Sequence, residues 1–480
     1  RYHYPFDYLT SWLEEHLSYQ GADGQLYDWI AAGAKSNFAG AAPKVREVYR
    51  SAKLADPNKL IQISADKNTT ESDQETSAVD AAYQVFKITG DRQWLSKKIN
   101  GRTLLDRLNL ALDYLVKNRL DAGHGLIKSA FTADWGDVSP IYLDQRAIYW
   151  DAKTPSAVGI YSNALFYNAA RQMEELNRAM PNETMANYWK LKFDEIKQNI
   201  NKHLWQEDRG FYRIHLLLTP QLLPNARDDS DIFAMGGNGL AVLYQIADER
   251  QTQRILEVAA QRQHQHGIST IAGVLLPAYP RGYFKHPAVS EEYVYQNGGQ
   301  WDWFAGRLLL AEFERGHSQR AYGELVEIAR KAVKNNGLFE WHDRNGEGKG
   351  SRDYAGSAGA LGGAIFQGLF GVYLNEATLA LRIRLGEQPG QIRLYEPASD
   401  HYVSYRYCYD QQSGTVTLDY ASNFPNAGQI HILLPANRKP EMLSLDGKQL
   451  RYETEDIGND SYVVVSTDWK SHVLQLKLSD

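Results

Sequence analysis

The stretch Ala78-Val-Asp-Ala-Ala-Tyr-Gln-Val-Phe-Lys-Ile88 decides the fold class of this chain. Val79, Ala82, Tyr83 and Phe86 recur at three- and four-residue spacing, which places them on one face of an α-helix. The same periodicity recurs in many segments before residue 388, so we predict a mainly α domain over residues 1–388. Helices are expected at 5–19, 71–89, 103–117, 156–180, 186–203, 231–247, 249–263, 298–315, 320–334 and 357–384.

The connections between these segments alternate in length. The link at 247–250 is short, whereas 121–155, 209–230 and 337–356 are long and rich in Gly, Asp, Trp and Tyr. Long loops in a compact domain are usually functional. The alternation favours an (α/α)6 barrel of helical hairpins, with its long loops at one mouth. Residues 389–480 instead read as short strands separated by turn signals, and they predict a small C-terminal antiparallel β-sandwich.

Composition excludes several classes of protein. Apolar residues make up 43% and charged residues 23% of the 480, which excludes collagen, a disordered tail and a coiled-coil rod. No apolar run reaches the roughly 18–20 residues of a membrane span, and a net charge of −6 without a basic tract disfavours nucleic acid. A single cysteine, Cys408, excludes an internal disulfide, and no Cys/His zinc pattern occurs. Because the sequence starts at Arg1 rather than Met, we expect a removed leader or a trimmed start, and the former favours export.

The aromatic composition points to a class of ligand. The chain has 30 Tyr and 11 Trp but only 15 Phe. Tyr and Trp combine a flat apolar face with a polar tip, and carbohydrate sites use such faces to stack on sugar C–H groups. We therefore expect a carbohydrate partner, although large enzymes also vary in aromatic content.

The first candidate for chemistry is the loop Phe131-Thr-Ala-Asp-Trp-Gly-Asp137. Asp134 and Asp137 flank Trp135. A carboxyl beside an indole can be desolvated, which raises its pKa and suits a general acid. The alternative is that one of the two carboxylates only caps a turn.

The second candidate is Glu340, which stands between Phe339 and Trp341 at the start of a Gly-rich loop. A carboxylate in an aromatic-lined mouth could activate water. A solvated surface charge is the alternative, and the two flanking aromatic residues count against it.

Two further stretches could bind sugar hydroxyls. Residues 295–304 combine aromatic rings, amides and an acid, although Asn297 could simply cap a helix while Trp303 enters the core. In 68–76, Asp73 and Glu75 could point into a barrel mouth, and capping of the following helix is the alternative.

In this order, the four stretches resemble six-hairpin (α/α)6-barrel glycoside hydrolases. The similarity is to the clan of processing α-glucosidase I, mannosylglycerate hydrolase and the amylo-α-1,6-glucosidase part of glycogen debranching enzymes. It covers about residues 5–385, and the small residues Ala355 and Gly356 depart from the family pattern. The resemblance is carried by Trp135-Gly-Asp137, Asn163-Ala-Leu-Phe-Tyr-Asn168, Tyr295-Gln-Asn-Gly-Gly-Gln-Trp301 and the run from Glu340 to Ala358.

The resemblance implies an inverting glycosidase that cleaves an α-linked glycoside, most closely an α-glucoside. Asp137 matches the general acid and Glu340 the general base, with Asp134 as the alternative acid. Inversion requires the two carboxyls to be roughly 6.5–9.5 Å apart, so that water fits between them. No metal or organic cofactor is implied. Substrate contacts are expected from Asp73, Trp135, Asn163, Asn297, Trp301, Trp341 and His342.

Several other functions fit the same type of barrel. A disaccharide phosphorylase would use phosphate in place of water and dispense with the base, so Glu340 favours hydrolysis. An α-L-rhamnosidase would keep the chemistry and change the sugar. A polysaccharide lyase would abstract a proton with Tyr, Arg or a histidine such as His124, His215 or His342. A carbohydrate-binding protein without turnover is the non-enzymatic alternative.

Overall fold

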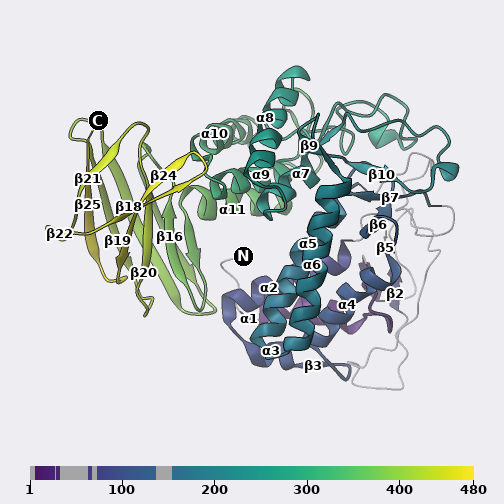
Figure 1. Cartoon of the computed structure of the whole chain (residues 1–480), viewed down its shortest axis with the longest axis horizontal. Coiled ribbons are helices and arrows are strands. Elements are labelled where there is room, and N and C mark those ends of the chain that lie inside the picture. The colour runs from purple at the N-terminus through teal and green to yellow at the C-terminus, as the bar shows by residue number, and fades with distance from the viewer. Residues whose placement is uncertain (1–5, 28, 33–62, 67–72, 137–153, 480) are drawn as a thin grey trace.

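The computed structural model of this chain describes residues 6–27, 29–32, 63–66, 73–136 and 154–479 (Figure 1). Helices dominate up to residue 369, as the hydrophobic periodicity predicts. They are α1 (Phe6–Ser18), α2 (Gln74–Thr89), α3 (Arg92–Ser96), α4 (Leu104–Asn118), α5 (Ile160–Ala179), α6 (Glu183–His203), α7 (Met235–Leu243), α8 (Glu249–Gln265), α9 (Asp302–Glu314), α10 (Ser318–Asn335) and α11 (Ala355–Gly363), which continues as a π-helix over Ala364–Leu369.

Local capping sets several helix ends. Gly90 ends α2 with a φ of 64° and donates its N–H to the carbonyl of Phe86, a left-handed conformation that suits glycine. At the start of α8, the Asp248 side chain accepts the Gln251 N–H, and the Gln251 side chain accepts the Asp248 N–H. This capping box satisfies two N–H groups that a helix N-terminus leaves without a partner.

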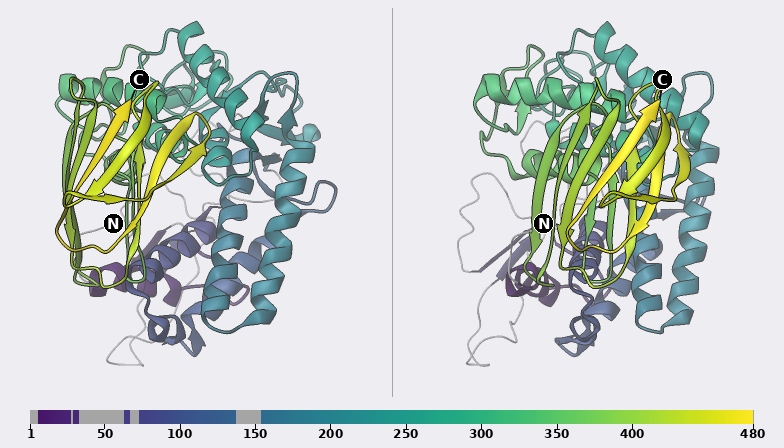
Figure 2. Two further views of the ribbon diagram at one scale, coloured as in Figure 1. Left: turned by 60° about the vertical axis from the view of Figure 1, so that its left-hand side comes forward. Right: turned by 90° about the vertical axis from the view of Figure 1, so that its left-hand side faces the viewer.

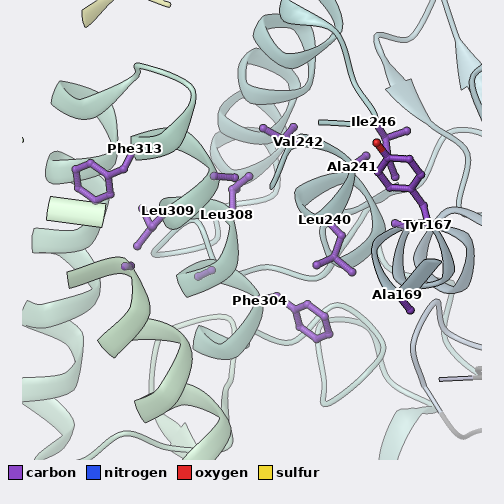
Figure 3. Close-up of a cluster of buried hydrophobic side chains, with 14 of the residues drawn as sticks. Tyr167, Ala169, Leu240, Ala241, Val242, Ile246, Phe304, Leu308, Leu309 and Phe313 are labelled. Atoms are coloured by element: carbon purple, nitrogen blue, oxygen red, sulfur yellow. The ribbon is translucent and has the colours of Figure 1, made fainter. Parts of the chain in front are cut away.

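The helices pair as hairpins around an apolar centre. Helix α5 packs on α6, α7 on α8 and α9 on α10, while α2, α5, α7, α9 and α11 contact one another in that order. Figure 3 shows Tyr167 of α5, Leu240 of α7, and Phe304 and Leu308 of α9 among the buried side chains where these helices meet. Burial of such a shared apolar face is the main source of helix stability in a protein of this kind.

The C-terminal part is a two-sheet β-sandwich. The first sheet has the strand order β15-β16-β20-β24-β23 and the second β17-β18-β19-β25-β21-β22. Along the longest strand, Val403, Tyr405 and Tyr407 are buried and alternate with more exposed residues, as expected for one face turned to a core. The strands are β15 (Val372–Leu374), β16 (Leu379–Ile383), β17 (Gly390–Glu396), β18 (His401–Asp410), β19 (Thr415–Ser422), β20 (Gly428–Leu433), β21 (Lys439–Leu445), β22 (Lys448–Leu450), β23 (Glu453–Ile457), β24 (Asp460–Thr467) and β25 (His472–Ser479).

Two parts of this arrangement differ from the sequence expectations. The helix predicted for 357–384 is wrong beyond residue 369, because β15 and β16 follow and join the first sheet. The sheets therefore take in residues before the boundary predicted at 388/389. Strand β16 also pairs in parallel with β20, so the sandwich is not purely antiparallel.

The β-sandwich lies beside α10 and α11 (Figure 1), and its strands lie in front of the helices in both turned views (Figure 2). Asp460 accepts hydrogen bonds from the backbone and hydroxyl of Ser318 at the start of α10. The Asn459 N–H donates to the carbonyl of Gly316 over 2.9 Å. These bonds join the turn before α10 to the turn before β24.

Candidate active site

The loop 131–136 continues from strand β6 (Leu126–Ala130), which lies in a small sheet with β5 (Leu120–Asp121), β7 (Ser156–Gly159) and β10 (His215–Leu217). The Gly136 N–H donates to the carbonyl of Ala133 over 2.8 Å, which closes a tight turn. Asp134, inside that turn, has a φ of 55°. Aspartate tolerates this left-handed conformation better than most residues, and it directs the carboxyl inward rather than along the loop.

Asp134 is buried at the N-terminus of α7. Its side chain is 5% exposed. Burial raises its pKa to about 7, against the lowering effects of His215 and of a hydrogen bond from the Gly237 N–H. A Cβ on Gly236 would come within 2.8 Å of the Asp134 Oδ2 atom, so a glycine is needed there for the carboxyl to reach the helix end. Asp134 is therefore a carboxyl that can hold its proton near neutral pH.

A second buried polar group borders this loop. The His215 ring lies 4.7 Å from the ring of Phe131. Its Nδ1 is 3.2 Å from Asp229 Oδ2, which also accepts the hydroxyl of Tyr279 over 2.8 Å. The long segment 209–230 thus contributes to the same region as the loop 131–136, as its composition suggests.

Glu340 precedes a short hairpin of β13 (Trp341–His342) and β14 (Gly348–Lys349). The carboxylate is half-buried. Its Oε2 accepts the Ser351 N–H over 3.2 Å, and its Oε1 lies 3.4 Å from the hydroxyl of Tyr295. A Cβ on Gly350 would come within 2.4 Å of Oε2, so this glycine makes room for the carboxylate.

Aromatic rings join the acid loop to the Glu340 hairpin. The Trp135 and Trp301 centroids are 4.6 Å apart, those of Trp301 and Tyr295 are 5.1 Å apart, and those of Tyr295 and Trp341 are 5.9 Å apart. The Tyr354 ring lies 6.4 Å from Trp301 on another side. We call Trp135, Trp301, Tyr295, Trp341 and Tyr354 the aromatic cluster. It brings segments near residues 135, 300 and 340 into one place.

Tyr354 also responds to the charge of Glu340. Burial raises the pKa of the Tyr354 hydroxyl, the negative charge of Glu340 raises it further, and Arg307 lowers it. A Cβ on Gly356 would come within 2.6 Å of the Tyr354 ring. The small residue at this position, which departs from the family pattern, therefore leaves space for Tyr354.

A buried ion pair supports the Glu340 hairpin from below. Lys331 Nζ donates to Asp302 Oδ1 over 2.7 Å and to Thr270 Oγ1 over 2.9 Å. His342 lies beside this pair and is fully buried; burial and the Lys331 charge lower its pKa to about 4. Gln300 and His342 exchange backbone hydrogen bonds of 2.9 and 2.8 Å. The hairpin is thereby fixed to the start of α9.

A model of one protein family covers most of this chain. The model of the mannosylglycerate hydrolase MGH1-like glycoside hydrolase domain matches residues 3–357. The chain belongs to this family. It therefore carries a glycoside hydrolase domain, and the clan resemblance seen in the sequence is confirmed. A search of curated proteins finds no match for this chain.

Solved structures share the fold of this MGH1-like chain at low sequence identity. An α-L-rhamnosidase from Dictyoglumus thermophilum is 12% identical with a TM-score of 0.59, over 99% of this chain and 46% of the rhamnosidase. This chain thus spans less than half of that enzyme. The GH63 mannosylglycerate hydrolase of Thermus thermophilus in complex with glucose is 13% identical with a TM-score of 0.53, over 75% of this chain and 90% of the hydrolase.

Within this MGH1-like domain, two predicted substrate contacts take structural positions. Asn163 is fully buried: its amide donates to the carbonyls of Ile127 and Gly159 and accepts the Ile127 N–H. Asn297 is also fully buried, and it donates to the Tyr279 carbonyl and accepts the Tyr279 N–H. Both amides are used by the backbone, so neither is directed at a ligand.

The other predicted site residues differ in how far their side chains are buried. Trp135 and Trp341 are half-buried members of the aromatic cluster, and Glu340 lies beside it. Trp301 is the buried member of the cluster, 1% exposed, and its indole N–H donates to the Tyr295 carbonyl. The fully buried His342 lies beside the Lys331–Asp302 ion pair. Asp73 stands directly before α2, where its carbonyl accepts the Thr76 hydroxyl.

Asp137, the predicted acid, lies outside the described residues. The described loop ends at Gly136, where a Cβ would come within 2.7 Å of Gln296 Oε1. Tyr295 and Tyr354 were not among the predicted site residues. The signal for Tyr295 was present, since it opens the aromatic and amide-rich segment 295–304, whereas nothing in the sequence singles out Tyr354.

In the part of the chain that the structure describes, no three His, Cys, Asp or Glu side chains are grouped so that they could hold a metal ion. None of the described helices combines the length and the hydrophobicity of a membrane span.

Proposed function

We propose that this protein is an inverting glycoside hydrolase that acts on an α-linked glycoside, in the first place an α-glucoside. Asp137 would protonate the departing glycosidic oxygen, and Glu340 would take a proton from the attacking water. We also propose that the helical hairpins close into an (α/α)6 barrel with this site at its mouth.

One observation carries the proposal: the aromatic cluster connects the loop 131–136 to Glu340. One member of the cluster, Trp135, stands two positions before Asp137 in the sequence. Another member, Tyr295, contacts the Glu340 carboxylate through its hydroxyl. An aromatic cluster that contacts one proposed carboxylate and contains the residue two positions before the other suits a glycosidic bond, because sugar rings pack on aromatic faces while the two carboxyls act from opposite sides.

The choice of sugar is part of the proposal. The α-glucoside follows from the clan resemblance, while the solved structures with this fold include a mannosylglycerate hydrolase and an α-L-rhamnosidase. A panel of aryl α-glucosides, α-mannosides and α-L-rhamnosides, α-linked disaccharides and mannosylglycerate therefore comes first. Phosphate dependence would identify a phosphorylase, and an unsaturated product absorbing in the ultraviolet would identify a lyase.

The stereochemistry of the first product tests the mechanism. Proton NMR during the first minutes of turnover should show β-glucose released from an α-glucoside before mutarotation. An α-anomer appearing first would mean retention, which requires carboxyls roughly 5–5.5 Å apart and a covalent intermediate. Glu340 would then have to be reassigned as a nucleophile or removed from the site.

Variants assign the two roles in the same experiment. Asp137→Asn should lower kcat about 10²–10⁴-fold on disaccharides and less on aryl glycosides, whose leaving groups need little protonation. Glu340→Gln should lower kcat by a similar factor on both substrate types. Glu347→Gln is the matched control, since Glu347 is exposed on the same hairpin. If Asp134→Asn is inactive while Asp137→Asn keeps wild-type activity, Asp134 is the acid.

A further inference from the structure

The hydroxyl of Tyr295 stands beside the proposed base. Its oxygen is 3.4 Å from Glu340 Oε1, while the Ser351 N–H donates to Oε2 over 3.2 Å. A separation of 3.4 Å is long for an O–H···O bond, and catalytic hydrogen bonds often tighten only when substrate binds. A donor on each oxygen fixes the rotation of the carboxylate and leaves its other lone pairs for water.

The backbone of Tyr295 is held in a conformation that tyrosine rarely adopts. Its φ is 48°, in the left-handed region that bulky residues avoid. The Gly299 N–H and Trp301 Nε1 both donate to the Tyr295 carbonyl, over 2.9 and 3.0 Å. A Cβ on Gly299 would come within 2.6 Å of that same oxygen. Such over-determined strain clusters at functional sites.

The Tyr295 ring is fixed as firmly as its backbone. It lies between the indole of Trp301, at 5.1 Å, and the indole of Trp341, at 5.9 Å. The ring therefore directs its hydroxyl at Glu340 without depending on a flexible side chain, and the rotamer freedom lost in forming the contact is small.

We propose that Tyr295 is a positioning residue for Glu340, an inference that rests on the proposed role of Glu340 as the base. The phenol donates to Oε1 and holds the carboxylate in the orientation that accepts a proton from water. Tyr295, from the segment before α9, contacts the Glu340 carboxylate, and the charge of Glu340 raises the pKa of Tyr354, at the start of α11. The cation that acts on Tyr354 in turn is Arg307 of α9.

Tyr295→Phe tests the proposal, because it keeps the ring between the two indoles and removes only the hydroxyl. The variant loses a hydrogen bond to a charged group, and such bonds are stronger than those between neutral groups. We therefore expect kcat/KM to fall about 10- to 100-fold, mostly through kcat. A phenol that donates to the ionised form of the proposed base favours that form, so loss of the hydroxyl should move the acidic limb of the pH–rate profile to higher pH. The assay uses the best substrate from the glycoside panel.

Tyr293→Phe is the matched control. Like Tyr295, Tyr293 has a positive φ, of 60°, but its hydroxyl contacts a different residue: it lies 2.9 Å from His266 Nδ1. This variant should keep the wild-type pH profile. Thermal unfolding is measured on both variants, so that a loss of folded protein is separated from a loss of rate.

Three outcomes would overturn the role of Tyr295. These are a raised KM with an unchanged pH profile, a parallel loss of stability and activity without a shift of the acidic limb, and the same profile shift in both variants. The failure of the proposed function has a different signature: Glu340→Gln would then keep its activity, whatever Tyr295→Phe does.

Discussion

The charge of Asp134 depends on residues that lie far from it in the sequence. Its carboxyl reaches the N-terminus of α7, where Gly236 leaves room and the Gly237 N–H donates to it. The sequence predicts a desolvated acid beside Trp135, and a raised pKa is what the structure has. The burial could not be read from the loop, because the glycines that permit it come about a hundred positions later in the chain.

The raised pKa of Asp134 predicts how stability depends on pH. The folded protein keeps this proton up to about pH 7, whereas an unfolded Asp releases it near its ordinary pKa of 3.8. Between these values the folded state binds more protons than the unfolded state does. The stabilisation that Asp134 contributes is therefore fully present below about pH 4 and is lost as the pH rises toward 7, by at most about 1.4 kcal/mol per pH unit.

Asp134→Asn removes this titration while keeping the shape of the side chain. The melting temperature of the variant, minus that of the wild type, should therefore rise between about pH 4 and pH 7 and level off above that. Thermal unfolding followed by circular dichroism across that range measures the difference. Parallel curves for the two proteins would show that Asp134 is already ionised in the folded state.

At the scale of single elements, buried asparagines fix the inner helices to neighbouring strands and loops. Asn163 in α5 bonds both backbone groups of Ile127, and Asn238 in α7 does the same with Tyr212. Each also donates to the carbonyl four residues before it, that of Gly159 or Ala234. The motif that resembled a substrate contact at Asn163 is therefore a repeated way of attaching a helix to a preceding hairpin.

This role of Asn163 could not be deduced from the sequence, because its partner Ile127 is 36 positions away. Helix existence was predictable, since it follows from local periodicity. The end of α11 was not, because the short strand β16 has apolar residues at every second position and its partner β20 comes much later in the chain. Pairing across such distances leaves no local signal.

Two glycines in the first turns of α7 should respond in opposite ways to substitution by alanine, as measured by the free energy of unfolding. A Cβ on Gly237 would come within 2.2 Å of Ile160 Cγ2 and 2.8 Å of the Tyr161 nitrogen, whereas a Cβ on Gly239 meets Leu308 at an ordinary 3.7 Å. Gly237→Ala should lower the free energy of unfolding by about 1–3 kcal/mol, because α7 must move away from α5.

Gly239→Ala is the control in the same helix. It should be neutral or stabilise the protein by up to about 1 kcal/mol, since alanine restricts the unfolded chain and favours a helix. Denaturant unfolding of both variants gives the comparison. Equal effects of the two substitutions would mean that α7 adapts to a side chain at Gly237.

At the scale of the whole molecule, the site arises where the ends of several hairpins meet. The loop 131–136, the segment 295–301 and the hairpin after Glu340 contact one another through the aromatic cluster. Of the long loops predicted to share one mouth, the described parts of 121–155 and 337–356 are joined through this cluster. The mouth shared by all of the long loops stays a prediction. Which side chains face one another there depends on the packing of α9 against α7 and α11, which no single segment encodes.

One of the contacts that attach the β-sandwich to the helices is buried at Asp460, and that contact predicts how the molecule unfolds. Asp460 is 7% exposed and accepts hydrogen bonds from the Ser318 backbone, the Ser318 hydroxyl and the Tyr462 hydroxyl. Asp460→Ala leaves these donors without a partner, which should cost about 1–3 kcal/mol. Asp456→Ala, which removes only an exposed bond to Ser461, should cost about 0.5 kcal/mol or less.

Differential scanning calorimetry shows whether the Asp460 contact couples the sandwich to the helices or stabilises only the turn before β24. If the contact couples the two parts, the wild type unfolds in one transition, and Asp460→Ala splits it into two as the sandwich and the helices separate. If Asp460 only stabilises the turn before β24, the transition stays single and moves to lower temperature. Activity on the glycoside panel, measured below the first transition, should be retained in Asp460→Ala, because Ser318 and Asp460 lie at the attachment of the sandwich and not in the aromatic cluster.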